Sequence, residues 1–160
     1  MRILTAATLG AAMTITALSA AAAAPTAQAN SAYLAANAKK KGVVQVPGLQ
    51  YRVIKSGKGT QPSRHDCVTV NYKGSFIDGK VFDQSKPGQP ITFGVGQVIP
   101  GWTLALQMMH AGDEWELTIP SGLAYGKGGT PDGTIPPDQT LVFDVEVLKV
   151  APSQMGQCPQ

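Results

Sequence analysis

Six short motifs contain the residues of this sequence that could do chemistry. Each combines aromatic, branched or acidic side chains with a nearby glycine or proline that turns the chain. Because the motifs lie on separate segments, the pattern predicts that their side chains converge on one lined pocket. In sequence order they are Asn71-Tyr72-Lys73-Gly74, Val81-Phe82-Asp83, Val98-Ile99-Pro100-Gly101-Trp102, Ala124-Tyr125-Gly126, Ile135-Pro136-Pro137 and Leu141-Val142-Phe143-Asp144.

Other kinds of site have little support in the sequence. His65 and His110 lie on separate segments without the spacing of metal ligands, so neither a metal nor a cofactor is expected. The glycine-rich residues 126–129 lack the Lys-Ser/Thr ending and the following helix of a phosphate-binding loop. The context of a nucleophile elbow is missing around Ser75, Ser85 and Ser121.

The segments that must position these motifs read mainly as strands. Apolar and polar residues alternate over residues 49–54, 67–72, 114–119 and 141–147. Asp78-Gly79 between apolar residues indicates a hairpin, and residues 86–90 interrupt the strand that follows it. One helix is predicted over residues 100–110, because Trp102, Ala105, Leu106 and Met109 share one stripe. The predicted class is α+β, with an antiparallel five-stranded sheet wrapped around one short helix.

Residues 1–29 are predicted to be a secretory signal peptide. Arg2 gives a positive start, residues 3–18 form an apolar core, and Ala27-Gln28-Ala29 resembles a cleavage site. An uncleaved membrane anchor is the alternative, since residues 3–24 carry no charge and are just long enough to span a bilayer. Alanine, threonine and glycine dominate that stretch and favour cleavage. We therefore expect a periplasmic or secreted protein with no stable membrane anchor.

Composition and charge exclude little else. The 160 residues suit one domain with a tail, and 43% apolar residues support a core. The net charge is +3 and no basic run exceeds Lys39-Lys40-Lys41, so no nucleic-acid partner is expected. A short helix is predicted between Asn30 and Gly42, where an alanine-rich segment ends in cations and a glycine.

Together the six motifs closely resemble the FKBP-type peptidyl-prolyl cis-trans isomerases, especially bacterial secreted members, over about residues 49–150. The resemblance implies an isomerase (EC 5.2.1.8) that rotates X-Pro bonds in a dry aromatic pocket and assists the folding of exported proteins. It divides the chain into a signal peptide (1–29), a short helix and linker (30–47), the isomerase domain (48–152) and a tail (153–160). The alternative is a binding module or holdase-type chaperone that uses the same groove with little turnover.

The resemblance also implies roles for individual residues. Ile99, through its backbone N–H, and Tyr125, through its hydroxyl, are the expected donors to the substrate main chain. Asp83 organises the polar edge of the site, where Lys86 is a candidate partner for it. The implied catalytic residues are Tyr72, Phe82, Asp83, Trp102, Tyr125 and Phe143. The implied substrate-binding residues are Val98, Ile99, Ile91 and Ile135.

The expected partners are proline-containing polypeptides and the macrolide inhibitors that occupy this family's pocket. Secreted relatives often carry a long helical dimerisation region upstream of the segment that resembles residues 33–40. Residues 30–46 are too short for such an interlocking helix pair, so we expect a monomer.

The chain has two cysteines, Cys67 and Cys158, which could form a disulfide or remain free thiols. Cys67 starts the second predicted strand, and Cys158 lies eight residues past the end of the last one. In the family these two strands are antiparallel neighbours, which brings the start of one close to the end of the other. A disulfide is therefore predicted, and two unpaired thiols remain the alternative.

Overall fold

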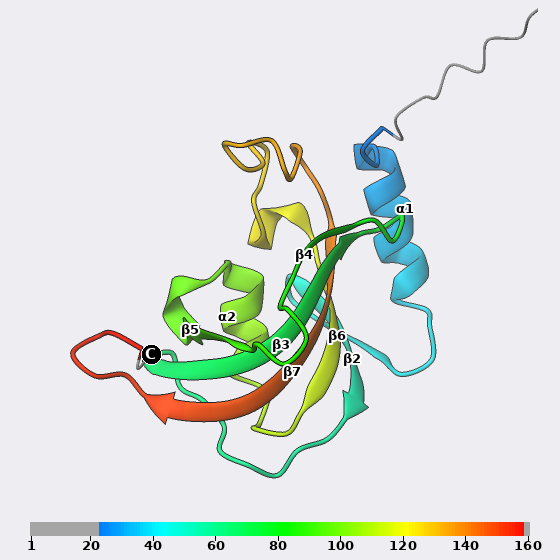
Figure 1. Cartoon of the computed structure of the whole chain (residues 1–160). Coiled ribbons are helices and arrows are strands. Elements are labelled where there is room, and N and C mark those ends of the chain that lie inside the picture. Colours follow the sequence, from blue (N-terminus) through cyan, green and yellow to red (C-terminus); the bar gives the residue numbers. More distant parts are fainter. Residues whose placement is uncertain (1–22, 159–160) are drawn as a thin grey trace, which may run out of the picture.

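An antiparallel sheet forms the centre of the computed structural model, which describes residues 23–158 (Figure 1). Its seven strands follow the order β1-β2-β6-β7-β3-β4, and β5 pairs with β3 beside β4. The strands are β1 (Val43–Val46), β2 (Leu49–Lys55), β3 (Asp66–Phe76), β4 (Val81–Gln84), β5 (Ile91–Gly94), β6 (Glu114–Ile119) and β7 (Leu141–Pro152).

The predicted fold class is confirmed, but the sheet has more strands than the five expected. Residues 30–47, predicted as a short helix and linker, contain β1, which pairs with β2 in a hairpin from Val46↔Leu49 outward. The interrupted strand divides into β4 and β5, and both pair with β3. β4 lies against the end of β3 around Gly74 and β5 against its start at Cys67, because the flap between them lets the chain change position along that edge.

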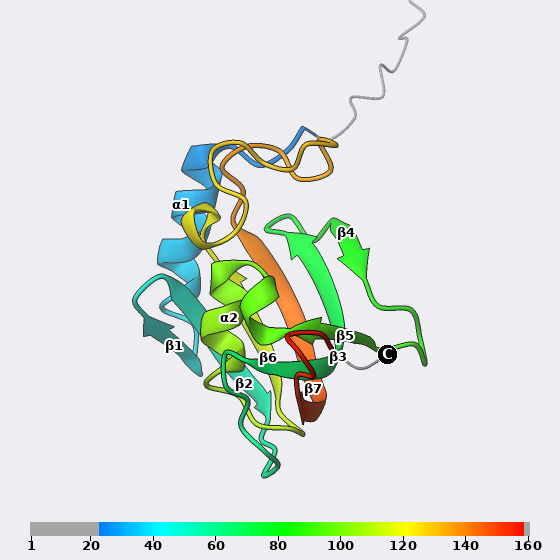
Figure 2. The same cartoon turned by 90° about the vertical axis from the view of Figure 1, so that its left-hand side faces the viewer.

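The helix α2 (Pro100–Leu106) packs on the concave face of the sheet (Figure 2). It is shorter than the predicted helix over residues 100–110. The amide of Met109 bonds both Ala105 O at 3.1 Å and Leu106 O at 3.2 Å, which tightens the last turn. The buried carboxylate of Asp113 then accepts a hydrogen bond of 2.6 Å from the N–H of His110. This N–H is therefore not available to continue the helix. Fully buried residues from helix and sheet form the core, among them Val68, Val70, Ala105, Leu106, Met109, Leu117, Ile119 and Val145.

The helix α1 (Ala27–Asn37) lies on the opposite face of the sheet from α2 (Figure 1). Its contact is polar, because two buried asparagines seven residues apart point from the same side of the helix. Asn37 Nδ2 donates to Gln50 Oε1 at 2.9 Å and to Thr118 Oγ1 at 3.2 Å. At the other end, Asn30 Oδ1 accepts the N–H of Thr140 at 3.1 Å. Specific hydrogen bonds rather than an apolar stripe therefore fix the position of α1.

The predicted boundaries near the N-terminus differ from the structure. Residues 1–22 of the predicted signal peptide lie outside the described residues. The helix expected between residues 30 and 42 starts at Ala27 and ends at Asn37, so the first turn of α1 includes the predicted cleavage segment. Thr26 caps this turn, its hydroxyl accepting the N–H of Ala29 at 3.2 Å. None of the helices formed by residues 23–158 is long and apolar enough to cross a bilayer.

The C-terminal tail returns to the start of β3. In the β3–β7 pairing Cys67 lies opposite Ala151, as expected for antiparallel neighbours. Beyond β7, Gln154 and Gln157 exchange backbone hydrogen bonds of 2.9 Å and turn the chain back. The turn brings Cys158 to Cys67, and the structure contains the predicted disulfide between them.

Candidate active site

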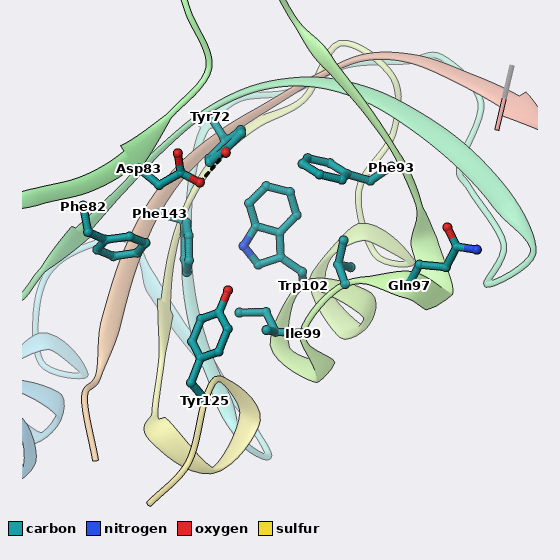
Figure 3. Close-up of a pocket in the computed structure, with 10 residues that line it drawn as sticks. Tyr72, Phe82, Asp83, Phe93, Gln97, Ile99, Trp102, Tyr125 and Phe143 are labelled. Atoms are coloured by element: carbon teal, nitrogen blue, oxygen red, sulfur yellow. Dashed lines mark hydrogen bonds between the residues drawn. The ribbon is translucent and has the colours of Figure 1, made fainter. Parts of the chain in front are cut away.

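A cavity of about 480 Å³ opens between the concave face of the sheet, α2 and the loop after β6. Its apolar wall comes from residues of five of the six sequence motifs, all except Ile135-Pro136-Pro137, together with one residue of β5. The lining residues are Tyr72, Phe82, Asp83, Phe93, Gln97, Val98, Ile99, Trp102, Tyr125 and Phe143. Figure 3 shows Phe82 and Tyr125 toward one end, Gln97 at the other, and Trp102 between them.

Trp102 forms the floor of the cavity. It lies in the first turn of α2, where Pro100 needs no hydrogen-bond partner for its missing N–H. The indole is only 3% exposed and is surrounded edge-to-face by three other rings. Ring centroids lie 5.4 Å away for Tyr72, 5.8 Å for Phe93 and 5.4 Å for Phe143. These contacts hold the indole in one orientation and leave an apolar surface facing the cavity.

Gly74 on β3 explains how the aromatic side wall fits together. A Cβ atom at this position would lie 2.7 Å from Phe82 Cζ and 2.8 Å from Phe143 Cε1. Only a residue without a side chain leaves room for these two rings, whose centroids are 5.7 Å apart. The glycine of the first motif therefore shapes the wall made by the second and sixth motifs.

The polar edge of the cavity is built around Asp83. Its Oδ2 accepts a hydrogen bond of 2.6 Å from the Tyr72 hydroxyl (Figure 3). Burial, together with this hydrogen bond, raises the pKa of Tyr72 well above its ordinary value. No ion pair between Asp83 and Lys86 is found in residues 23–158, so Tyr72 rather than the flap lysine orients the carboxylate.

Two hydrogen-bond donors of the cavity have no protein partner within the described part of the chain. One is the hydroxyl of Tyr125, which points into the cavity in Figure 3, and the other is the backbone N–H of Ile99. Burial, and secondarily the charge of Asp83, raise the pKa of Tyr125. The phenol therefore stays a neutral donor at physiological pH. An extended polypeptide entering the cavity could use both donors for its carbonyl oxygens.

The structure brings eight of the ten predicted site residues to this cavity and leaves two outside its lining. Ile91 is 36% exposed near the start of β5, where the flap ends. Ile135 is buried in the loop before β7 and lines a neighbouring cavity instead.

Sequence reasoning missed two residues of the lining. Phe93 lies opposite Val68 of β3, and its two-residue spacing from Ile91 could have indicated that it faces the same side as Val68 and Val70. Gln97 lies in a short 3-10 turn (Val95–Gln97) for which the sequence has no signal. Within residues 23–158 no group of three or more His, Cys, Asp or Glu side chains could hold a metal ion.

Comparisons with known proteins agree with this geometry. The family model described as FKBP-type peptidyl-prolyl cis-trans isomerase matches residues 58–148. A second model, described as the domain amino terminal to FKBP-type peptidyl-prolyl isomerase, matches residues 4–53. The crystal structure of FkpA from Escherichia coli superposes with a TM-score of 0.74 at 48% identity, covering 80% of this chain and 62% of that chain.

Two curated relatives show a similar level of identity. The FKBP-type 22 kDa peptidyl-prolyl cis-trans isomerase of Escherichia coli (strain K12) is 53% identical over 120 residues, which are 74% of this chain and 58% of that protein. The outer membrane protein MIP of Legionella longbeachae is 50% identical over 121 residues, which are 74% of this chain and 52% of that protein. The chain thus spans about half the length of the curated relatives it matches.

Proposed function

This chain belongs to the FKBP-type peptidyl-prolyl cis-trans isomerases, and from that membership we propose that it catalyses rotation about X-Pro peptide bonds in the cavity over Trp102. The observation that carries the proposal is the pairing of a dry aromatic surface with two unused donors, Tyr125 Oη–H and Ile99 N–H. Its substrates are proline-containing polypeptides.

The chemistry needs no nucleophile. Rotation must break amide resonance against a barrier of roughly 18 to 20 kcal/mol. The twisted amide has a less polarised carbonyl than the planar one, so a pocket that excludes water favours the transition state over the ground state. Lowering the barrier by about 7 kcal/mol would accelerate rotation by about five decades.

The residues of the cavity have separate roles in this proposal. Trp102, Phe82 and Phe143 surround the proline ring, with Val98 and Ile99 completing the apolar contact. The donors of Ile99 and Tyr125 hold the substrate main chain while the bond turns. Further positioning residues are Tyr72 and Asp83, whose mutual hydrogen bond orients the polar edge, whereas Ile91 and Ile135 contact more distant parts of a bound polypeptide.

We also propose that the protein works outside the cytoplasm, in the periplasm or as a secreted protein, after a signal peptide within residues 1–29 has been removed. The disulfide between Cys67 and Cys158 supports this location, because such bonds persist in oxidising compartments. There the isomerase would act on exported proteins as they fold. The remaining segments proposed are the short helix and linker over residues 30–47, the domain over residues 48–152 and the tail over residues 153–160.

A monomer is the proposed oligomeric state. The exposed large apolar side chains of the strands are distributed over β1, β2, β4, β5 and β7 rather than gathered on one element. Stable interfaces between subunits usually need a contiguous apolar surface. Sedimentation equilibrium at micromolar concentration distinguishes a monomer from a dimer.

A protease-coupled assay on proline tetrapeptides tests the proposed activity. The rate should rise in proportion to enzyme concentration, persist in EDTA, and fall on addition of an immunosuppressant macrolide that competes for the cavity. Failure of a saturating macrolide to slow the reaction would contradict the assignment of the reaction to this pocket. Binding of peptides without any acceleration would favour the holdase-type alternative.

A further inference from the structure

Two of the smaller cavities beside the pocket over Trp102 lie at its two ends. One, of about 320 Å³, shares Phe82, Asp83 and Tyr125 with that pocket and extends to Asp132. We name it the Asp132 cavity. The other, of about 370 Å³, shares Val98 with the pocket and extends to Arg64, and we name it the Arg64 cavity. Figure 3 shows Phe82 and Tyr125 toward one end of the pocket, and Gln97, the neighbour of Val98, at the other.

The Asp132 cavity is lined by two carboxylates. Asp83 is oriented by Tyr72, as described above, and Asp132 is oriented by its own loop. Asp132 Oδ2 accepts a hydrogen bond of 2.8 Å from Thr134 Oγ1, and Oδ1 accepts one of 3.1 Å from Thr134 N. The hydroxyl of Thr130 and these two donors lower the pKa of Asp132 to about 2, so the carboxylate is charged at neutral pH. Within residues 23–158 no cationic side chain lines this cavity.

The Arg64 cavity carries the opposite charge. Among the described residues that line it, Arg64 is the one that carries a charge. Its side chain lies across Gly96, where an added Cβ would be 3.3 Å from Arg64 Cγ and 3.6 Å from Nε. His65 and Asp66 lie beyond Arg64, next to the disulfide, and the Asp66 carboxylate accepts the N–H of Ser63 at 2.7 Å.

The charged ends of both cavities are available to a ligand. Neither Arg64 nor Asp132 takes part in an ion pair within residues 23–158. An extended polypeptide advances about 3.3 Å per residue, so a chain whose proline lies over Trp102 places residues a few positions away in both cavities. The two flanks of a bound proline therefore meet charges of opposite sign.

Resting on the isomerase function proposed above, we propose that this groove selects its substrates by charge. A cationic side chain on one flank of the proline binds in the Asp132 cavity, and an anionic side chain on the other flank binds beside Arg64. The favoured substrates are polypeptides in which the proline lies between a basic and an acidic residue in one chain direction. Polypeptides with the reversed order are disfavoured, because each charged side chain then meets a like charge.

Three peptides of equal length around one X-Pro bond test the proposal. One has neutral flanks, one has a lysine a few positions before the proline and a glutamate a few positions after it, and one has these two residues exchanged. Exchange NMR gives kcat/KM for each without a coupling protease. Since solvent-exposed ion pairs contribute modestly, we expect one charged order to exceed the other by about twofold to fivefold per charge at low ionic strength, and 0.5 M salt to remove most of the difference.

Matched variants assign the effect to its residues. Asp132→Asn should weaken the preference contributed by lysine, because Asp83 remains in that cavity, and Arg64→Gln should abolish the preference contributed by glutamate. Asp138→Asn and Lys58→Gln remove the same charges at residues that line neither cavity and should keep the wild-type ratio. Equal rates for the two charged peptides, or equal loss of the ratio in the control variants, would overturn the proposal. Absence of turnover of even the neutral peptide would instead overturn the isomerase function.

Discussion

Removing the Tyr125 hydroxyl distinguishes two contributions to catalysis, hydrogen bonding to the substrate and exclusion of water from it. Tyr125→Phe removes one donor and leaves the ring, so kcat/KM should fall by about threefold to tenfold, the equivalent of 0.5 to 1.5 kcal/mol. Phe82→Ala and Trp102→Leu remove the aromatic contacts that we propose for the proline ring, and each should cost more than that. Circular dichroism checks that every variant is folded. A larger loss in Tyr125→Phe than in the two aromatic variants would show that desolvation is not the main contribution.

The pH dependence of the reaction follows from the same residues. Tyr72 and Tyr125 have raised pKa values, so their neutral hydroxyl forms persist above pH 10, the ordinary midpoint of a tyrosine. With an uncharged peptide we expect kcat/KM to stay constant from pH 8 to pH 10. The wild-type profile is compared with that of Tyr125→Phe. A wild-type decline centred below pH 10 that is absent from the variant would contradict the raised pKa of Tyr125.

At the scale of elements, α1 is held to the sheet by polar contacts that can be broken singly. Asn37→Ala leaves Gln50 Oε1 and Thr118 Oγ1 without their buried donor, a change that costs about 1 to 3 kcal/mol. We expect faster amide exchange in α1, which hydrogen-exchange mass spectrometry measures. Because α1 lies on the face opposite the pocket, isomerase activity should change little.

Ser31→Ala is the matched control for this prediction. Ser31 lies exposed on the same helix. Its exchange rates should equal those of the wild type. Unchanged protection of α1 in Asn37→Ala would show that contacts other than this asparagine hold the helix.

The elements also show which parts of the structure the sequence could predict. The alternation in β2, β3, β6 and β7 and the stripe of α2 are strong because each faces one apolar core. The start of α1 is harder to predict, since Thr26 is a good cap but lies directly before the segment that resembles a cleavage site. β1 has few alternating residues, and its existence depends on pairing with β2 rather than on its own pattern.

The sequence likewise could predict some residues of the candidate site and not others. Trp102, Tyr125 and Phe143 could be predicted because each lies in a motif with a distinctive neighbour. Phe93 could not, because its place in the lining depends on how β5 registers against β3 after an irregular flap. Gln97 lines the pocket only through the turn that follows β5.

At the scale of the whole molecule, the disulfide joins residues that are 91 positions apart. In the chain-entropy model, closing a loop of that size stabilises the fold by up to about 4 kcal/mol. Cys158→Ser should therefore lower the free energy of unfolding in urea, whereas Gln157→Ser, in the same tail, should not. Two alkylatable thiols in protein purified from its native compartment would contradict the presence of the bond.

The cavity over Trp102 is proposed to accelerate rotation of X-Pro bonds. Exchange NMR of a neutral proline peptide with a substoichiometric amount of protein measures it most directly, because the cis and trans populations and their rate of exchange are observed together. A catalyst raises the exchange rate and leaves the populations unchanged. We predict that result for the wild type and a strongly reduced rate for folded Trp102→Leu. Unaccelerated exchange, with peptide signals shifted only in proportion to the protein added, would contradict the claim and indicate binding without catalysis.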